Sequence, residues 1–139
     1  MQIRELANTF FAAYRSHDVA TMVDLFEADG LVEYVPLEMR GTASKEGKGV
    51  WGALIDAFPD LTNVVSRMYA SDAEGYATVE VVIGGRQAKE FMGIASQGRS
   101  FRLEHAFIIT CGSDGKISRM TAYWDNLKLL KELGGQVPT

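Results

Sequence analysis

One titratable side chain lies within an otherwise apolar stretch of this sequence. His105 belongs to the segment 101–109, Phe-Arg-Leu-Glu-His-Ala-Phe-Ile-Ile. Because side chains alternate between the two faces of a strand, we expect His105 to share a buried face with Leu103 and Phe107. A histidine in such surroundings is able to accept and return a proton near neutral pH. The alternative is a core histidine that is hydrogen-bonded to a neighbouring strand or helix.

Asp125 is the second candidate for proton transfer. It follows Tyr123-Trp124 and precedes an expected helix over 127–133. As a general acid or base it would need its pKa raised by a poorly solvated site. As a helix N-cap it would contribute about 1 kcal/mol to stability, and this interpretation is the favoured one.

Further side chains are candidates for lining a ligand pocket. Either Glu33 or Tyr34 should point inward from the first strand, and the sequence leaves open which; Tyr34 could donate a hydrogen bond to a carbonyl oxygen. Gln87 could orient such a carbonyl, or it could lie on a solvated strand edge. For most of the aromatic residues, simple core packing is the alternative. The full set of candidate ligand contacts is Tyr14, Tyr34, Trp51, Gln87, Phe91, Phe107 and Trp124.

The elements that would position these residues follow from hydrophobic periodicity and turn signals. Helices are predicted over 3–14, over a short segment that Asp18 caps, over 50–58 and over 127–133. Strands are predicted over 31–35, 64–70, 76–83, 87–92, 101–111 and 117–124, with 36–49 an irregular loop over the mouth of a pocket. Helices followed by a run of hairpin-linked strands indicate an α+β fold, and mid-strand glycines indicate a curved sheet. We therefore expect one domain over residues 1–139, with helices packed on a strongly curved antiparallel or mixed sheet around one apolar pocket.

Composition excludes several classes of function. The net charge is −4, from 14 basic and 18 acidic residues, and no basic cluster suits nucleic acid or an anionic membrane surface. The only cysteine, Cys111, cannot form an internal disulfide, and one cysteine with two histidines makes a poor zinc site. We expect no metal site, no membrane span and a cytoplasmic location.

The order of elements and several short motifs resemble a known family. The segments 57–61 (Ala-Phe-Pro-Asp-Leu), 90–94 (Glu-Phe-Met-Gly-Ile), 98–101 (Gly-Arg-Ser-Phe) and 114–117 (Asp-Gly-Lys-Ile), together with Tyr123-Trp124-Asp125, are similar to those of the SnoaL-like polyketide cyclases in the nuclear transport factor 2-like superfamily. The resemblance implies a conical domain that dimerises through its open sheet face and uses no cofactor. It also implies aldol-type closure of a polyketide ester by a general acid/base.

The chain departs from this family at two places. Gln87 or its neighbours occupy a segment where many members carry a histidine, and Met120 stands where an acidic residue is common early in the last strand. The resemblance therefore leaves three hypotheses. The first is cofactor-independent aldol-type or isomerase chemistry on an apolar carbonyl compound, with His105 and Asp125 as the acid/base pair. The second is a dimeric small-molecule binding domain without catalysis. The third is a domain that only dimerises and whose pocket is vestigial.

Overall fold

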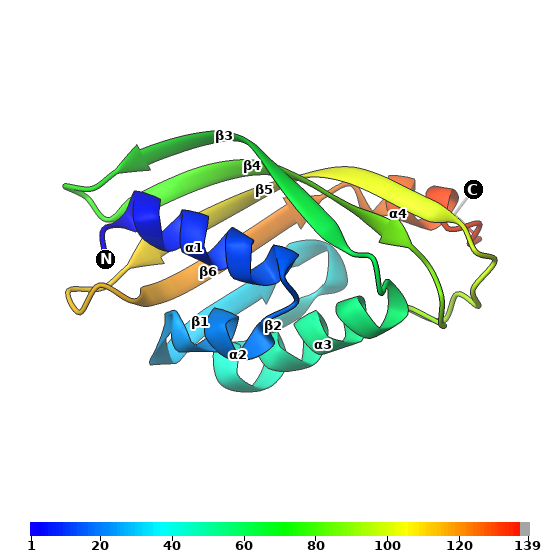
Figure 1. Ribbon diagram of the computed structural model, residues 1–139, viewed down its shortest axis with the longest axis horizontal. Helices are drawn as coiled ribbons and strands as arrows, with labels where there is room; N and C mark the ends of the chain where they lie inside the picture. Colours follow the sequence, from blue (N-terminus) through cyan, green and yellow to red (C-terminus); the bar gives the residue numbers. More distant parts are fainter. Residues whose placement is uncertain (137–139) are drawn as a thin grey trace.

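Helices and strands alternate in the first half of the chain, and hairpin-linked strands make up most of the second. The computed structural model describes residues 1–136 (Figure 1). Its elements in chain order are α1 (Ile3–Arg15), α2 (Val19–Asp24), β1 (Phe26–Tyr34), the 3₁₀ turn η1 (Val35–Leu37), β2 (Met39–Thr42), the π turn η2 (Ala43–Gly47), α3 (Lys48–Ala57), β3 (Thr62–Ser71), β4 (Tyr76–Arg86), β5 (Ser100–Cys111), β6 (Ile117–Trp124) and α4 (Asn126–Glu132). The predicted α+β class is confirmed.

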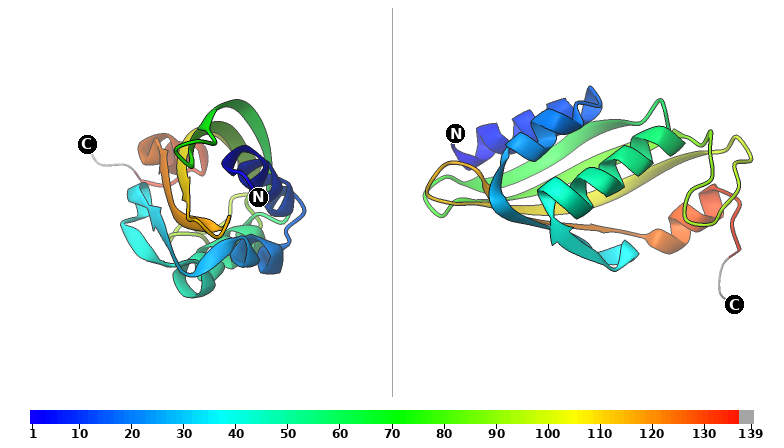
Figure 2. Two further views of the ribbon diagram at one scale, coloured as in Figure 1. Left: turned by 90° about the vertical axis from the view of Figure 1, so that its left-hand side faces the viewer. Right: turned by 90° about the horizontal axis from the view of Figure 1, so that it is seen from below.

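The strands form one mixed, open sheet in the order β2-β1-β6-β5-β4-β3. Neighbouring strands are antiparallel except for β1 and β6, which run parallel. Viewed end-on, the sheet curls around α1, and α3 lies below it (Figure 2). The curl gives the sheet a concave side that faces the helices and an outer side that no helix within residues 1–136 covers.

Helix α1 crosses the concave side because its apolar residues form one stripe. Its buried residues, which follow three- and four-residue spacing, are Ile3, Leu6, Ala7, Phe10, Phe11, Ala13 and Tyr14. The chain then turns through His17, whose φ of 60° is in the left-handed region. His17 Nε2 donates a hydrogen bond to the Leu61 carbonyl oxygen at 2.7 Å, which ties this corner to the start of β3.

The segment 36–49, predicted to be an irregular loop, is largely ordered as regular structure. Strand β2 pairs antiparallel with β1, so that Met39 lies opposite Tyr34 and Thr42 opposite Leu31. Glu38 at φ 52° makes the tight connection between them. The prediction failed because β2 is a short edge strand with two polar residues and a glycine, and its sequence carries no alternating hydrophobic pattern.

Two further segments differ markedly from the prediction. Strand β1 begins at Phe26, five residues early, and its pairing with β6 shifts register between Phe26 and Leu31. The predicted strand over 87–92 is absent, because β4 ends at Arg86. In its place Phe91 and Ile94 exchange backbone hydrogen bonds across a tight turn that is made possible by positive φ angles of 54° at Met92 and 76° at Gly93.

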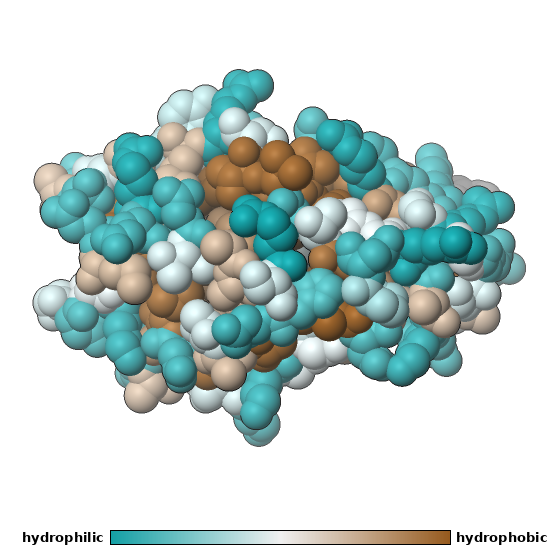
Figure 3. Space-filling view, viewed as in Figure 1, coloured by the Kyte–Doolittle hydropathy of each residue, from teal (hydrophilic) through white to brown (hydrophobic). Residues whose placement is uncertain are grey.

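The pairing of the strands shows which side chains lie on each face of the sheet. On the concave face His105 lies opposite Val81 of β4 and Trp124 of β6, and Phe107 lies opposite Val79 and Ala122. The outer face carries polar side chains together with exposed apolar ones, which are Leu31, Val64, Tyr69, Tyr76, Ile108 and Tyr123. Hydrophobic side chains are visible along β3 at the upper margin of the molecule (Figure 3). Within residues 1–136, no helix combines the length and apolar character needed to cross a membrane.

Candidate active site

A small apolar cavity lies between the helices and the concave face of the sheet. It is lined by Tyr14, Tyr34, Leu37, Leu54, Ile83, Phe91, Phe101, Leu103, His105, Phe107, Trp124 and Leu129. Its volume is about 30 Å³. Since one water needs roughly 10–15 Å³ measured in this way, the cavity has room for about two waters. A ligand with a ring therefore requires some of these side chains to move, and Leu37, Leu54, His105 and Trp124 are the lining residues that are only half-buried.

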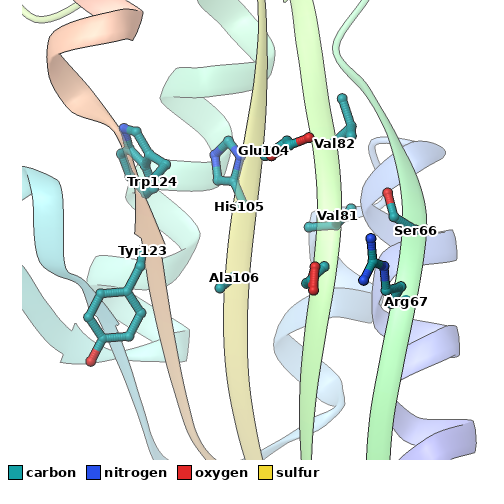
Figure 4. Close-up of a pocket in the computed structure, with 10 residues that line it drawn as sticks. Ser66, Arg67, Val81, Val82, Glu104, His105, Ala106, Tyr123 and Trp124 are labelled. Atoms are coloured by element: carbon teal, nitrogen blue, oxygen red, sulfur yellow. The ribbon is translucent and has the colours of Figure 1, made fainter.

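His105 lies between the aromatic rings of Phe107 and Trp124. The imidazole is stacked on Phe107 with centroids 6.0 Å apart and is tilted against Trp124 at 5.0 Å. Figure 4 shows His105 and Trp124 side by side on neighbouring strands. His105 Nδ1 lies 3.1 Å from the Leu103 carbonyl oxygen. Because a carbonyl oxygen only accepts, Nδ1 carries the hydrogen in the neutral ring, and Nε2 keeps a lone pair that can take up a proton.

Burial controls the charge of this histidine. Desolvation in the apolar site lowers the pKa of His105 to about 4, although the hydrogen bond to Leu103 acts in the opposite direction. The imidazole is therefore neutral at pH 7. A neutral ring with Nε2 unprotonated is the form required of a general base.

Two tyrosines and a tryptophan form a polar group within the aromatic wall. Tyr34 is 2% exposed, and its hydroxyl oxygen accepts a hydrogen bond from Trp51 Nε1 at 2.8 Å. The phenols of Tyr14 and Tyr34 also interact, and this interaction contributes to the pKa shift of each. Burial raises the pKa of both tyrosines, so both are neutral phenols. The question left open by the sequence is answered here: Tyr34 points inward, and Glu33 points outward toward Arg119.

Three predicted site residues are not among those that line the cavity. Asp125 is exposed, and its side chain accepts a hydrogen bond from the Lys128 amide as the N-cap of α4. Trp51 is fully buried behind Tyr34 and reaches the site only through the indole N–H. Gln87 donates from Nε2 to the carbonyl oxygens of Lys89 and Ile94, so its amide holds the loop that carries Phe91.

The remaining predicted contacts, Tyr14, Tyr34, Phe91, Phe107 and Trp124, do line the cavity together with His105. The predicted site did not include six of the lining residues, although Leu103 was expected on the face of His105 and Phe101 shares that face by alternation. Leu37, Leu54, Ile83 and Leu129 completed the wall. Leu37 and Leu129 come from short segments, and hydrophobic periodicity does not predict where these segments lie against the sheet.

A wide groove also crosses the outer face of the sheet behind His105. Its volume is about 500 Å³, and its lining includes Arg67 of β3, Glu80 of β4, Glu104 of β5 and Tyr123 of β6 (Figure 4). The Tyr69 hydroxyl and the carboxylate of Glu80 raise the pKa of Arg67. Among residues 1–136, no three His, Cys, Asp or Glu side chains gather as metal ligands would.

The geometry can now be compared with known proteins. The family model of the SnoaL-like polyketide cyclases matches residues 4–133. The chain belongs to this family. Comparison with curated protein sequences gave no significant match.

Solved structures with the same fold include other SnoaL-like proteins. IdmH, a candidate polyketide cyclase from Streptomyces antibioticus, is 24% identical with a TM-score of 0.80 over 96% of this chain and 99% of that one. AclR, a candidate hydroxylase from Streptomyces galilaeus, is 19% identical with a TM-score of 0.83 over 97% and 96% of the two chains. A candidate SnoaL-like cyclase from Jannaschia sp. CCS1 is 16% identical with a TM-score of 0.83 over 98% and 94%. At sequence identities of 16–24%, the structural similarity shows that these proteins share the fold.

Proposed function

We propose that this SnoaL-like protein catalyses cofactor-independent acid/base chemistry, of the aldol or isomerase type, on an apolar carbonyl compound. The observation that carries the proposal is His105 Nε2, an unprotonated ring nitrogen at the wall of an aromatic cavity. Family membership supports the same class of reaction.

In the proposed reaction His105 removes a proton from the carbon next to a carbonyl group. The C–H electron pair becomes the enolate, and the proton resides on Nε2. In an aldol closure the enolate carbon attacks a second carbonyl, and the new alkoxide recovers the proton from the imidazolium; in an isomerisation another carbon recovers it. Because burial lowers the pKa of His105 to about 4, the base is weak, and the substrate needs an acidified C–H bond such as one between two carbonyl groups.

Hydrogen–deuterium exchange tests this proposal without knowledge of the natural substrate. Methyl benzoylacetate, an apolar 1,3-dicarbonyl compound, is incubated with the protein in D₂O, and loss of its central C–H signal is followed by NMR. We expect His105→Gln to lower the protein-dependent rate at least about 100-fold. His17→Asn is the matched control, because it removes the other histidine at a corner where asparagine tolerates the left-handed φ. Equal rates for wild type and His105→Gln would refute the role of His105.

A ligand-binding domain without catalysis is the second candidate. It is favoured by one observation: among the described residues that line the cavity none is a carboxylate, since Asp125 caps α4 and the Met120 position is apolar and buried. If this second function is correct, the protein binds methyl benzoylacetate, but the hydrogen–deuterium exchange of the compound does not depend on His105.

We further propose a homodimer formed through the outer face of the sheet. Exposed apolar side chains such as Ile108 and Tyr123, each more than 40% exposed, support this assignment. Sedimentation equilibrium is expected to give twice the chain mass for wild type and the monomer mass for Ile108→Arg. A monomeric wild type at micromolar concentration would refute it. The cytoplasmic location stays a prediction.

A further inference from the structure

The Tyr34 hydroxyl has an uneven set of hydrogen-bond partners. Its oxygen accepts from Trp51 Nε1 at 2.8 Å, and it also interacts with the hydroxyl of Tyr14. The bond from Trp51 occupies one lone pair of the Tyr34 oxygen, and the hydrogen of the Tyr34 hydroxyl takes no part in it.

A phenol has two acceptor lone pairs and one hydrogen to donate. The hydrogen bond from Trp51 engages one of these lone pairs, and the hydrogen of Tyr34 remains to be donated to another group. Within residues 1–136, the bond from Trp51 is the one hydrogen bond that the geometry of the Tyr34 hydroxyl shows. Tyr34 lines the cavity, so the free hydrogen is available to a ligand that lies there.

We propose that Tyr34 donates a hydrogen bond to the ligand's carbonyl oxygen and that Trp51 is a positioning residue that orients the Tyr34 hydroxyl. This inference deepens the function proposed above, because it rests on the ligand having a carbonyl group. It assigns an enolate-binding donor to the site and gives the buried Trp51 a role beyond packing.

Trp51 is suited to this role because its own ring is fixed. Its indole is fully buried and packs against Phe10, with centroids 5.6 Å apart, and against Phe26 at 5.7 Å. Donation into the phenol oxygen also polarises the O–H bond and strengthens its onward hydrogen bond. Loss of the indole N–H would leave the Tyr34 hydroxyl free to rotate toward other partners.

The position of Tyr34 relative to His105 fits a single ligand that bridges both. The two rings contact the same tryptophan: Tyr34 lies 5.5 Å from Trp124 and His105 lies 5.0 Å from it, between ring centroids. Both also contact Phe107. A planar carbonyl compound lying against these rings would place its oxygen at Tyr34 and its acidic carbon at His105.

A pair of probes that differ by one oxygen tests the role of Tyr34. Acetophenone and ethylbenzene have nearly the same shape, and only the ketone accepts a hydrogen bond. Their dissociation constants are measured by NMR titration. We expect wild type to prefer the ketone about 3- to 10-fold, the value of one hydrogen bond, and Tyr34→Phe to lose this preference while ethylbenzene binding changes little. Tyr14→Phe should retain most of the preference.

The proposal is overturned if wild type shows no ketone preference, or if Tyr14→Phe removes it and Tyr34→Phe does not. The binding assay involves no turnover. His105→Gln should therefore keep the preference, so a failure of the proposed catalysis and a failure of this inference give different results.

Trp51 needs a readout that a packing role would not change. The ¹³Cζ signals of labelled tyrosines report the hydrogen bonding of each hydroxyl, and Tyr34→Phe assigns the relevant signal. We expect Trp51→Phe to shift the Tyr34 signal and to reduce the ketone preference. Phe26→Leu, which disturbs the packing of the indole and keeps its N–H, should leave both unchanged. Equal behaviour of Trp51→Phe and Phe26→Leu would show that Trp51 only packs.

Discussion

The half-buried imidazole of His105 should make the stability of the protein depend strongly on pH. Its pKa is about 4 in the folded chain, because the apolar site disfavours the charged ring. In the unfolded chain the ordinary value is about 6.5. Between these two values the unfolded state binds a proton that the folded state does not. Acidification therefore favours unfolding, and the free energy of unfolding rises with pH through this window.

The size of the effect follows from the two pKa values. Relative to neutral pH, His105 alone should lower the free energy of unfolding by about 2 kcal/mol at pH 5 and about 3 kcal/mol at pH 4. The change should be small above about pH 7, where the imidazole is neutral in both states.

Urea unfolding of wild type and His105→Gln across this range isolates the contribution of the imidazole. Other titrating groups are common to both proteins, so the difference between their free energies of unfolding should fall by about 3 kcal/mol from neutral pH to pH 4. Two-bond ¹H–¹⁵N NMR spectra should also show the Nδ1–H tautomer at neutral pH. A difference that does not vary with pH, or a titration midpoint of the ring near 6.5, would refute the reasoning.

Other predictions concern residues around the cavity. Asp125→Ala should lower stability by about 1 kcal/mol through loss of the α4 cap, measured by urea unfolding; a hundredfold loss of the exchange rate as well would contradict a purely capping role. Phe107→Ala should lower the free energy of unfolding by about 3–5 kcal/mol, because the ring is 1% exposed and packs against several aromatic residues. Thermal unfolding measures this loss, and a loss below about 1 kcal/mol would show that neighbouring side chains fill the space left by the ring. Gln87→Leu should speed amide exchange at Phe91 and Ile94, followed by NMR, because it removes both side-chain hydrogen bonds that Gln87 donates to their loop.

Elements with strong periodicity were predictable from the sequence. The stripe of α1 and the alternation of β5 follow from local spacing, so the face on which His105 lies could be predicted without knowledge of its neighbours. Short segments could not be predicted in this way. Strand β2, for example, is defined by its pairing with β1 and has no hydrophobic pattern of its own.

The candidate site was predictable only in part, for a similar reason. Phe107 lies on the face that alternation indicates and reaches the cavity, whereas the choice between Glu33 and Tyr34 was left open by the sequence and needed the structure. Trp51 and Gln87 were expected to contact a ligand, but the structure gives them other partners, Tyr34 and the carbonyl oxygens of the 87–94 loop. Such pairings join elements far apart in the chain, and no local signal reports them.

The place of β6 in the sheet has a consequence for how the chain folds. Of the strands in residues 1–136 it comes last along the chain, yet it lies between β1 and β5, and Met120 of β6 pairs with Val32 of β1. The hairpin β1–β2 and the meander β3–β4–β5 are therefore separate pieces until residues 117–124 join them. Folding during synthesis cannot be completed before this strand leaves the ribosome, and until then β1 and β5 each present an unpaired edge that is prone to aggregation. Such late, long-range pairing predicts slow folding.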